Sequence, residues 1–359
     1  MLVVFLKLHT PRTPFLADIK AIDWVGVLFV VGGVVMFLLG LESGGASHPW
    51  SSAFTLCLII FGLVTFALFF VNEWKFAKYP IMPLRLFNNQ VACAAFTLCF
   101  LHGFVFIAGV YFLPLYFQIV LAATPLMSGV YLLPFVLVLS IFSGLVGIFI
   151  KKTGRYREPI WFGVLFMTLG FGLLIDLPAA PGWAKIILYQ IIAGVGVGPN
   201  FQSPLIALQS TVDGHDIASA TSAFGFIRQL STSLSVVLGG VIFTNVFSTQ
   251  LDRERRSSSS PLPESLLSRL SASTAGTDTE LLRSLPTDQK QVINELYTFG
   301  LSRMWIFYAV FSFLAVVVSL FIGKRTLSKQ HEQTRTGLEE MEKGRRERRA
   351  QHEERKAES

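Results

Sequence analysis

Residues 86–150 decide the fold class: "LFNNQVACAAFTLCFLHGFVFIAGVYFLPLYFQIVLAATPLMSGVYLLPFVLVLSIFSGLVGIFI" contains no Asp, Glu, Lys or Arg over 65 consecutive positions. A helix crosses a bilayer with about 20 apolar residues. The core of a water-soluble protein does not account for an uncharged run of this length. The sequence therefore predicts a polytopic membrane protein, an all-α bundle of transmembrane helices.

The composition of the whole chain agrees with this prediction. Of 359 residues, 52% are hydrophobic and 15% are charged, whereas soluble domains carry about 25% charge. Cys57, Cys93 and Cys99 lie in apolar spans without metal-ligand spacing, so we expect no disulfide framework, no metal and no cofactor. In a membrane protein the position of basic residues matters more than the net charge of +7, and no nucleic-acid partner is expected.

Eight segments are long and apolar enough to span a bilayer, and the uncharged run divides into two of them at "AATPLMSG". The expected spans are Ile22–Leu41, Ala53–Asn72, Val91–Val120, Leu126–Ile150, Pro159–Ile175, Ile186–Gln209, Ile217–Val246 and Met304–Gly323.

Basic residues predict the orientation of these spans. The short loops of one set contain Lys7, Arg12, Lys20, Lys75, Lys78, Arg85, Lys151, Lys152, Arg155 and Arg157. The alternate short loops contain Lys185 alone, so the first set is expected to be cytoplasmic, together with both termini. Arg253, Arg255 and Arg256 disagree, but they begin a long loop, and long loops report orientation weakly.

The expected organisation has four parts. Residues 1–21 form the end of a preceding helix and a cytoplasmic loop, 22–72 two linker helices, 73–323 a six-helix unit, and 324–359 a charged cytoplasmic tail. The six-helix unit contains an outside loop at about 247–303. That loop has helical apolar spacing at Leu262, Leu266, Leu267 and Leu270, and again at Val292, Ile293, Leu296 and Tyr297. It is either a lid or interfacial helix, or a partly ordered connector.

The segment "GVGVGPNFQSPLIALQ", residues 194–209, predicts a weakened helix inside a span. Pro199 and Pro204 each remove a backbone donor, which membrane helices tolerate where the backbone is buried in protein or lines a cavity. Gly194, Gly196 and Gly198 follow no strand and precede no Lys-Ser/Thr pair, so they do not form a phosphate loop. We expect them to let a neighbouring backbone approach closely.

Polar residues at membrane depth are the candidates for a substrate pathway. They are Tyr111, Tyr116, Gln118, Asn200, Gln202, Gln209, Arg228 and Gln229. Arg228 lies about eleven residues into its span, and a guanidinium at that depth costs at least about 2.5–3.5 kcal/mol unless it faces protein or water. The alternative for the amides is a structural role in hydrogen bonds between helices.

An enzyme active site is not predicted. The sequence has no HExxH motif, no GxSxG motif and no pair of acids within a span. His215 and Asp216 are explained by a turn at Asp213-Gly214, followed by Asp216 as the N-cap of the next helix.

Several motifs together resemble a known family. "GVGVGPNFQSPLIALQ", "YFLPLYFQIVLAATPLMSGVYLLP" and "ATSAFGFIRQL" are similar to the C-terminal half of the major facilitator superfamily, within its fourteen-span drug:proton antiporter branch of fungal efflux pumps. "IDWVGVLFVVGGVVMFLLGLESGG" resembles the first linker helix of that branch, and "YPIMPLRLFNN" its approach to the seventh core helix. The loop "GIFIKKTGRYR" matches the family motif at Gly147, Lys152, Gly154 and Arg155, with Lys151 where an acid is usual.

The resemblance implies a transporter with two six-helix halves and a small-molecule substrate bound between them. It implies proton-coupled efflux of small amphipathic compounds across the plasma membrane or a vacuolar membrane, with the lipid bilayer, the substrate and protons as partners. The resemblance covers residues 1–325 and includes only the linker helices and the second half. We therefore expect a missing N-terminal half and no transport by this chain alone. The alternatives are a non-transporting fragment or assembly partner and, less favoured, a membrane enzyme.

Overall fold

The computed structural model describes residues 22–44, 47–77, 82, 84–256, 262–272 and 285–323. Expectations for residues 1–21, for Lys78, for the Ser run at 257–260 and for the tail at 324–359 lie outside these residues. The α-helices are α3 (Trp24–Ser43), α4 (Ala53–Lys75), α5 (Gln90–Ile119), α6 (Pro125–Tyr131), α7 (Leu133–Thr153), α8 (Arg157–Leu173), α9 (Trp183–Val197), α10 (Ser203–Gln209), α11 (Ile217–Arg256), α12 (Glu264–Ala272) and α14 (Thr287–Ser319). Four 3-10 turns join some of them: η1 (Leu84–Asn88), η2 (Leu174–Asp176), η3 (Gly198–Phe201) and η4 (Gly214–Asp216).

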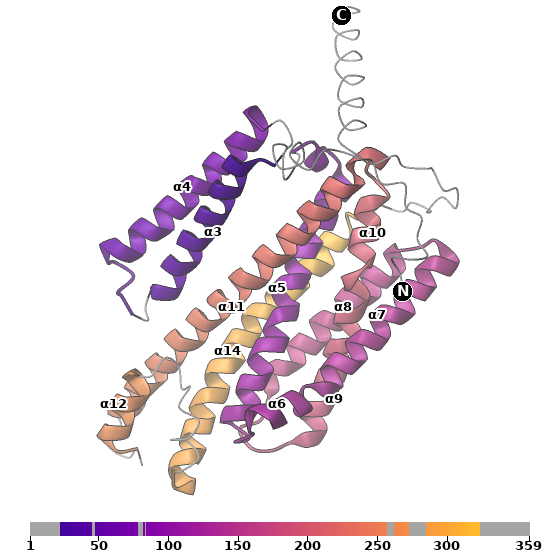
Figure 1. The fold of residues 1–359 in the computed structure, drawn as a ribbon. Coiled ribbons are helices and arrows are strands. Elements are labelled where there is room, and N and C mark those ends of the chain that lie inside the picture. The colour runs from indigo at the N-terminus through magenta and orange to yellow at the C-terminus, as the bar shows by residue number, and fades with distance from the viewer. Residues whose placement is uncertain are drawn as a thin grey trace, which may run out of the picture.

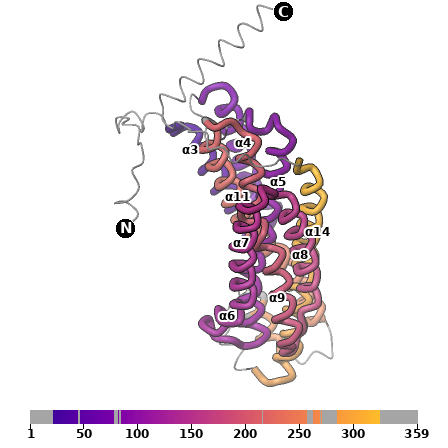
Figure 2. The backbone as a smooth tube through the Cα atoms, turned by 90° about the vertical axis from the view of Figure 1, so that its right-hand side faces the viewer, coloured from indigo at the N-terminus to yellow at the C-terminus, as the bar shows by residue number. Residues whose placement is uncertain are grey.

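The long helices lie side by side along one axis and alternate in direction (Figures 1 and 2). Among the described residues, eight helical segments are long and apolar enough to cross a membrane. This confirms the predicted all-α membrane bundle with eight spans. The two ends of the bundle are named here by one residue each: the Lys151 end, where α7 finishes, and the Lys185 end, where α9 begins.

The structure corrects the expected loop at 247–303. Helix α11 continues to Arg256 over 40 residues, and α14 begins at Thr287, well before the expected start of the last span at Met304. The apolar pattern at Val292, Ile293, Leu296 and Tyr297 is therefore neither a lid nor a connector but the first turns of α14. Its apolar face packs onto the bundle, and Asn294 Nδ2 donates to the Val120 carbonyl at 3.1 Å.

The other apolar pattern of that segment includes the short helix α12. Its leucines are buried in the same core cluster as α5 and α14, and Arg255 Nε lies 3.0 Å from a carboxylate oxygen of Glu264. The helix therefore turns its apolar face toward the protein. The buried leucines are Leu262, which precedes α12, and Leu266, Leu267 and Leu270 within it.

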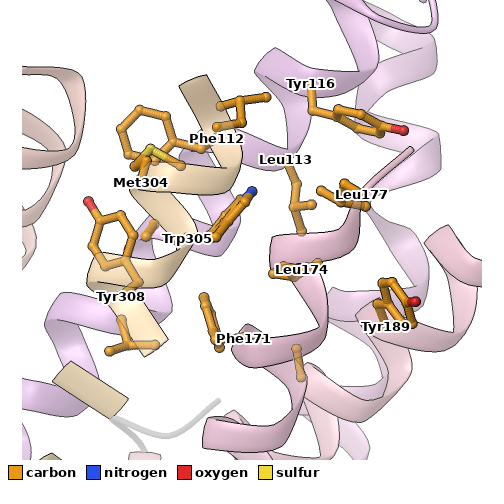
Figure 3. Close-up of a cluster of buried hydrophobic side chains, with 14 of the residues drawn as sticks. Phe112, Leu113, Tyr116, Phe171, Leu174, Leu177, Tyr189, Met304, Trp305 and Tyr308 are labelled. Carbon is orange, nitrogen blue, oxygen red and sulfur yellow. The ribbon is translucent and has the colours of Figure 1, made fainter. Parts of the chain in front are cut away.

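The core of the bundle lies between α5, α8 with η2, and α14. Figure 3 shows Trp305 of α14 between Phe171 of α8 and Tyr308 of its own helix. The ring centroids of Trp305 lie 5.9 Å from Phe171 and 6.0 Å from Tyr308. Tyr308 also hydrogen-bonds across to α11, where its hydroxyl donates to the Ser235 carbonyl at 2.6 Å. Aromatic packing thus fixes α14 against the rest of the bundle.

The linker helices α3 and α4 pack on each other and stand beside α11 (Figure 1). Asn72 Nδ2 donates to Asp23 at 2.6 Å, which joins the two helices near the Lys151 end. At the same end Arg85 of η1 binds the carboxylate of Asp216 through two hydrogen bonds. Asp216 directly precedes α11, so this ion pair, which the sequence did not suggest, ties the segment before α5 to the start of α11.

Gly154 explains one position of the loop motif. It ends α7 with a left-handed backbone (φ 69°), which a glycine adopts without steric cost. Lys152 and Arg155 are exposed beside it, and Gly147 lies on an exposed face of α7.

Candidate functional site

The helix break predicted at Pro199 and Pro204 is present. Helix α9 ends at Val197, the 3-10 turn η3 follows, and α10 begins at Ser203. A proline has no N–H to donate, so carbonyls near the break lose their helical partners. In an apolar environment each such carbonyl needs another donor.

Four side chains bind carbonyls at this break, and we call the arrangement the carbonyl clamp. Two of the four side chains come from the interrupted helix itself, one comes from α5 and one from α11. The pairs are Asn200 Nδ2 to the Gly196 carbonyl at 3.3 Å, His102 Nε2 to the Val197 carbonyl at 3.0 Å, Ser203 Oγ to the Pro199 carbonyl at 2.7 Å, and Arg228 to the Phe201 carbonyl at 2.9 Å.

Arg228 is the charged member of the clamp. Its guanidinium lies 5.0 Å from the ring of Phe224 and 5.4 Å from the ring of Phe201. Cation–π contacts and a hydrogen bond to a carbonyl both favour a cation away from water. Gly103 lets α5 approach this part of α11, since a Cβ there would lie 2.5 Å from Ser231 Oγ.

His102 is a clamp residue that the sequence analysis did not single out. It is fully buried, with its ring 6.2 Å from Phe106 and 5.0 Å from Phe201. The Val197 carbonyl only accepts, so Nε2 carries the hydrogen and Nδ1 of the neutral ring is an acceptor. Among the described residues Nδ1 has no hydrogen-bond partner. The available signal was that His102 is the single histidine of the uncharged run at 86–150.

The alternating glycines before the break serve close packing, as predicted. A Cβ on Gly194 would lie 2.8 Å from the Phe135 carbonyl oxygen of α7, and one on Gly198 2.5 Å from that of Leu139. A Cβ on Gly196 would collide with the backbone of Met167 on α8. The three glycines therefore bring the end of α9 into backbone contact with two neighbouring helices.

The other candidate pathway residues lie in different places. Tyr116 is buried and donates to the Pro178 carbonyl at 2.7 Å. Gln209 donates to Thr221 Oγ1 at 3.0 Å near the Lys151 end. Gln202 and Gln229 are exposed. The predicted residues do not form one site.

Tyr111 and Gln118 line a cavity, which we call the α3 cavity. It has a volume of about 840 Å³ and lies between the end of α3 and the Lys185 halves of α5 and α11. Its walls are mainly apolar and include a few polar side chains. The polar residues are Glu42, Tyr111, Gln118, Ser233, Thr244 and Asn245.

One exposed face of α11 consists of small and polar residues. The exposed positions recur every three or four residues, which places them on one side of the helix. They are Ala218, Ser222, Gly225, Gln229 and Ser233. In a membrane-spanning helix, an exposed polar face is suited to contact with protein or water.

Comparison with known protein families gives a match that covers more than half of the chain. Residues 19–236 match the Major Facilitator Superfamily. The chain belongs to this superfamily. Members are embedded in the lipid bilayer, so the protein is an integral, multi-pass membrane protein.

Relatives in this superfamily align with nearly all of the chain. The efflux pump dotC of Dothistroma septosporum is 45% identical over 339 residues, which is 94% of this chain and 57% of the relative. The MFS-type transporter ppz2 of Metarhizium majus is 42% identical over 356 residues, 99% of this chain and 61% of the relative. The MFS-type efflux pump LUC4 of a Fusarium species is 32% identical over 343 residues, with 94% and 60% covered.

The chain thus spans about three-fifths of the length of these transporters. Within the part that the structure describes, no group of three or more His, Cys, Asp and Glu side chains is placed to hold a metal ion. The chemically distinct features of this superfamily member are the carbonyl clamp, the polar face of α11 and the α3 cavity.

Proposed function

We propose that this chain forms one side of a transport pathway in an efflux transporter for small amphipathic compounds. The observation that carries the proposal is the carbonyl clamp. A helix that is interrupted at membrane depth, yet has four of its carbonyls bound by side chains, is a defined joint in the bundle. Such joints let part of a helix move while its polar groups stay paired.

The polar face of α11 supports a pathway beside this joint. Gln229 adjoins the clamp residue Arg228 in sequence and is exposed, as is Gln202 next to η3. Amides in these positions suit contact with water, a solute or a second helical bundle. We propose that such a bundle completes the pathway, whether it belongs to the same polypeptide or to another one. Alternating access then arises from rocking of the two bundles.

Proton coupling is the further part of the proposal. The acids of the described spans lie near helix ends. Examples are Asp23, Glu73, Glu158 and Asp176. The acids that exchange protons during transport would then belong to the second bundle. Lys151 replaces the usual acid in the loop motif, so that loop does not supply one.

Efflux in cells tests the proposal. This chain is expressed alone, and also joined behind the N-terminal part of dotC that the alignment leaves uncovered, in cells without their own drug pumps. We expect the joined protein to lower the retention of a fluorescent amphipathic dye, and a protonophore to abolish the effect. Equal dye retention with and without the joined protein, at normal membrane abundance, contradicts the proposal. Efflux by the chain alone contradicts the need for a second bundle.

Orientation and membrane are tested by labelling. In a variant without Cys57, Cys93 and Cys99, we expect an impermeant maleimide to label Ser47→Cys in intact cells and not Thr153→Cys. Labelling of intact cells requires the plasma membrane, which we favour over a vacuolar membrane. The reverse labelling pattern contradicts the proposed cytoplasmic position of the Lys151 end.

A further inference from the structure

The α3 cavity lies between a linker helix and the six-helix bundle, away from the helix break. Its volume of about 840 Å³ falls within the range of about 300–1,000 Å³ typical of small-molecule sites. Leu38, Glu42 and Gly44 form one wall, and the other walls come from α5 and α11. The cavity is therefore large enough for a drug-sized molecule with an apolar body.

The charge on the residues that line the cavity is negative. Among the residues that the structure places around the cavity, Glu42 is the one with a formal charge, and no Lys, Arg or His lines it. Glu42 is exposed beside mainly apolar walls, and its carboxylate attracts a positively charged partner. Tyr111, which is 54% exposed, adds an aromatic ring, and the face of such a ring attracts cations.

The uncharged polar groups also favour a cation or a hydrogen-bond donor. Gln118 donates to Ser128 Oγ at 3.2 Å, Ser233 to the Gln229 carbonyl at 3.0 Å, and Asn245 to the Val241 carbonyl at 2.8 Å. Each of these side chains uses a donor within the protein and retains an oxygen that can accept.

A backbone carbonyl adds to these acceptors. Pro114 lies inside α5 and has no N–H for the carbonyl of Val110, four residues earlier. Both residues line the cavity. Among the described residues no side chain donates to the Val110 carbonyl, whereas side chains bind the carbonyls at the η3 break.

We propose that the α3 cavity binds an amphipathic organic cation, with its apolar body between α5 and α11 and its charge toward Glu42. This inference does not depend on transport, because binding at the cavity is measured on the chain itself. The two proposals can therefore fail separately.

Tetraphenylphosphonium is a suitable probe, and tetraphenylborate is an anion of nearly the same shape. Binding of each ion is measured by equilibrium dialysis against the full chain in lipid nanodiscs, with the value for empty nanodiscs subtracted. Trp50 provides a second readout, since a Cβ on Gly44 would lie 2.5 Å from its ring, which places the indole beside the cavity wall. We expect saturable binding of the cation with a change in Trp50 fluorescence, and weaker binding of the anion.

Two variants localise the site. Glu42 is exposed, so Glu42→Gln should leave the fold intact and weaken cation binding about two- to fivefold, the range for exposed ion pairs. Gly240 lines the cavity and has nothing within 4 Å of an added Cβ. Gly240→Leu should weaken binding about tenfold or more, because the ligand and the new side chain need the same space.

Gly172→Leu is the matched control, since Gly172 also has open space around it and lies on α8. It should bind the cation as the unaltered chain does. Equal binding of cation and anion, or full affinity in Glu42→Gln, overturns the assignment of a cation. Full affinity in Gly240→Leu overturns the location.

Discussion

The carbonyl clamp and the α3 cavity place polar side chains of the same two helices, α5 and α11, in opposite situations. At the clamp, His102 and Arg228 each donate to a carbonyl of the broken helix and are covered by aromatic rings. At the cavity, Tyr111 and Asn245 line open space. The type of residue does not separate the two groups. What separates them is the element opposite: at the clamp the carbonyls of the broken helix lie within reach of both donors, whereas the cavity residues face a volume of about 840 Å³.

The packing of glycines shows the same contrast. Gly196 is in contact with backbone on α8, and Gly240 faces the cavity with nothing within 4 Å of an added Cβ. A methyl group is therefore excluded at one position and accommodated at the other. Four predictions test the difference between the two regions.

The largest effect is expected from Gly196→Ala. The new methyl group collides with the Met167 backbone, so α8 and α9 must separate, at a cost of about 3 kcal/mol in the free energy of unfolding. Gly240→Ala is the control and should change it by less than about 0.5 kcal/mol. Unfolding in an SDS titration measures both. Equal destabilisation of the two variants would show that the packing at Gly196 is not special.

The next effect is expected from Arg228→Met, which keeps an apolar stem and removes the donor to the Phe201 carbonyl. An unpaired carbonyl in a buried site costs about 1–3 kcal/mol, and loss of the two ring contacts adds to it. The neighbouring Gln229 is exposed, so Gln229→Met should change the free energy of unfolding little. In an active transporter Gln229→Met should instead lower efflux. If Arg228→Met lowers efflux at unchanged stability, Arg228 belongs to the pathway and not to the clamp.

A smaller effect is expected from His102→Phe, which fills the same space without a donor. The Val197 carbonyl then lacks its partner, and we expect a loss of about 1–2 kcal/mol. His102→Gln should recover part of this loss, because an amide can donate to the same carbonyl. Thermal unfolding followed by size-exclusion chromatography compares the two variants. Equal stability of Phe and Gln at position 102 would show that the hydrogen bond contributes nothing.

The smallest effect concerns Pro114→Ala at the α3 cavity. The new N–H can pair with the Val110 carbonyl and removes one acceptor from the cavity wall. We expect binding of tetraphenylphosphonium to weaken about twofold, since other acceptors remain. Val236→Ala, another substitution in the lining, serves as the control for a change of shape. Tighter binding in Pro114→Ala would exclude a role for the carbonyl.

The amino-acid sequence alone was sufficient to predict the membrane spans and the position of the helix break. Eight segments of the sequence are long and apolar enough to cross a bilayer, so the spans followed from length and composition. Pro199 and Pro204 act on their own backbone, and Gly194, Gly196 and Gly198 admit neighbours by lacking a side chain. These effects are local, and they could be predicted without knowledge of the partner helices.

The tertiary structure decided which polar residue binds what. Asn200 and Gln202 are two positions apart in an apolar segment, yet one is buried against Gly163 and the other is exposed. His102 is 95 residues from the carbonyl that it binds, and Arg85 is 131 residues from Asp216. Packing also decided whether the apolar residues after Phe247 form a loop or helices, because the bundle covers the apolar faces of α12 and α14. A side chain's hydrogen-bond partner is set by which helix lies opposite, and only the packed bundle specifies that neighbour.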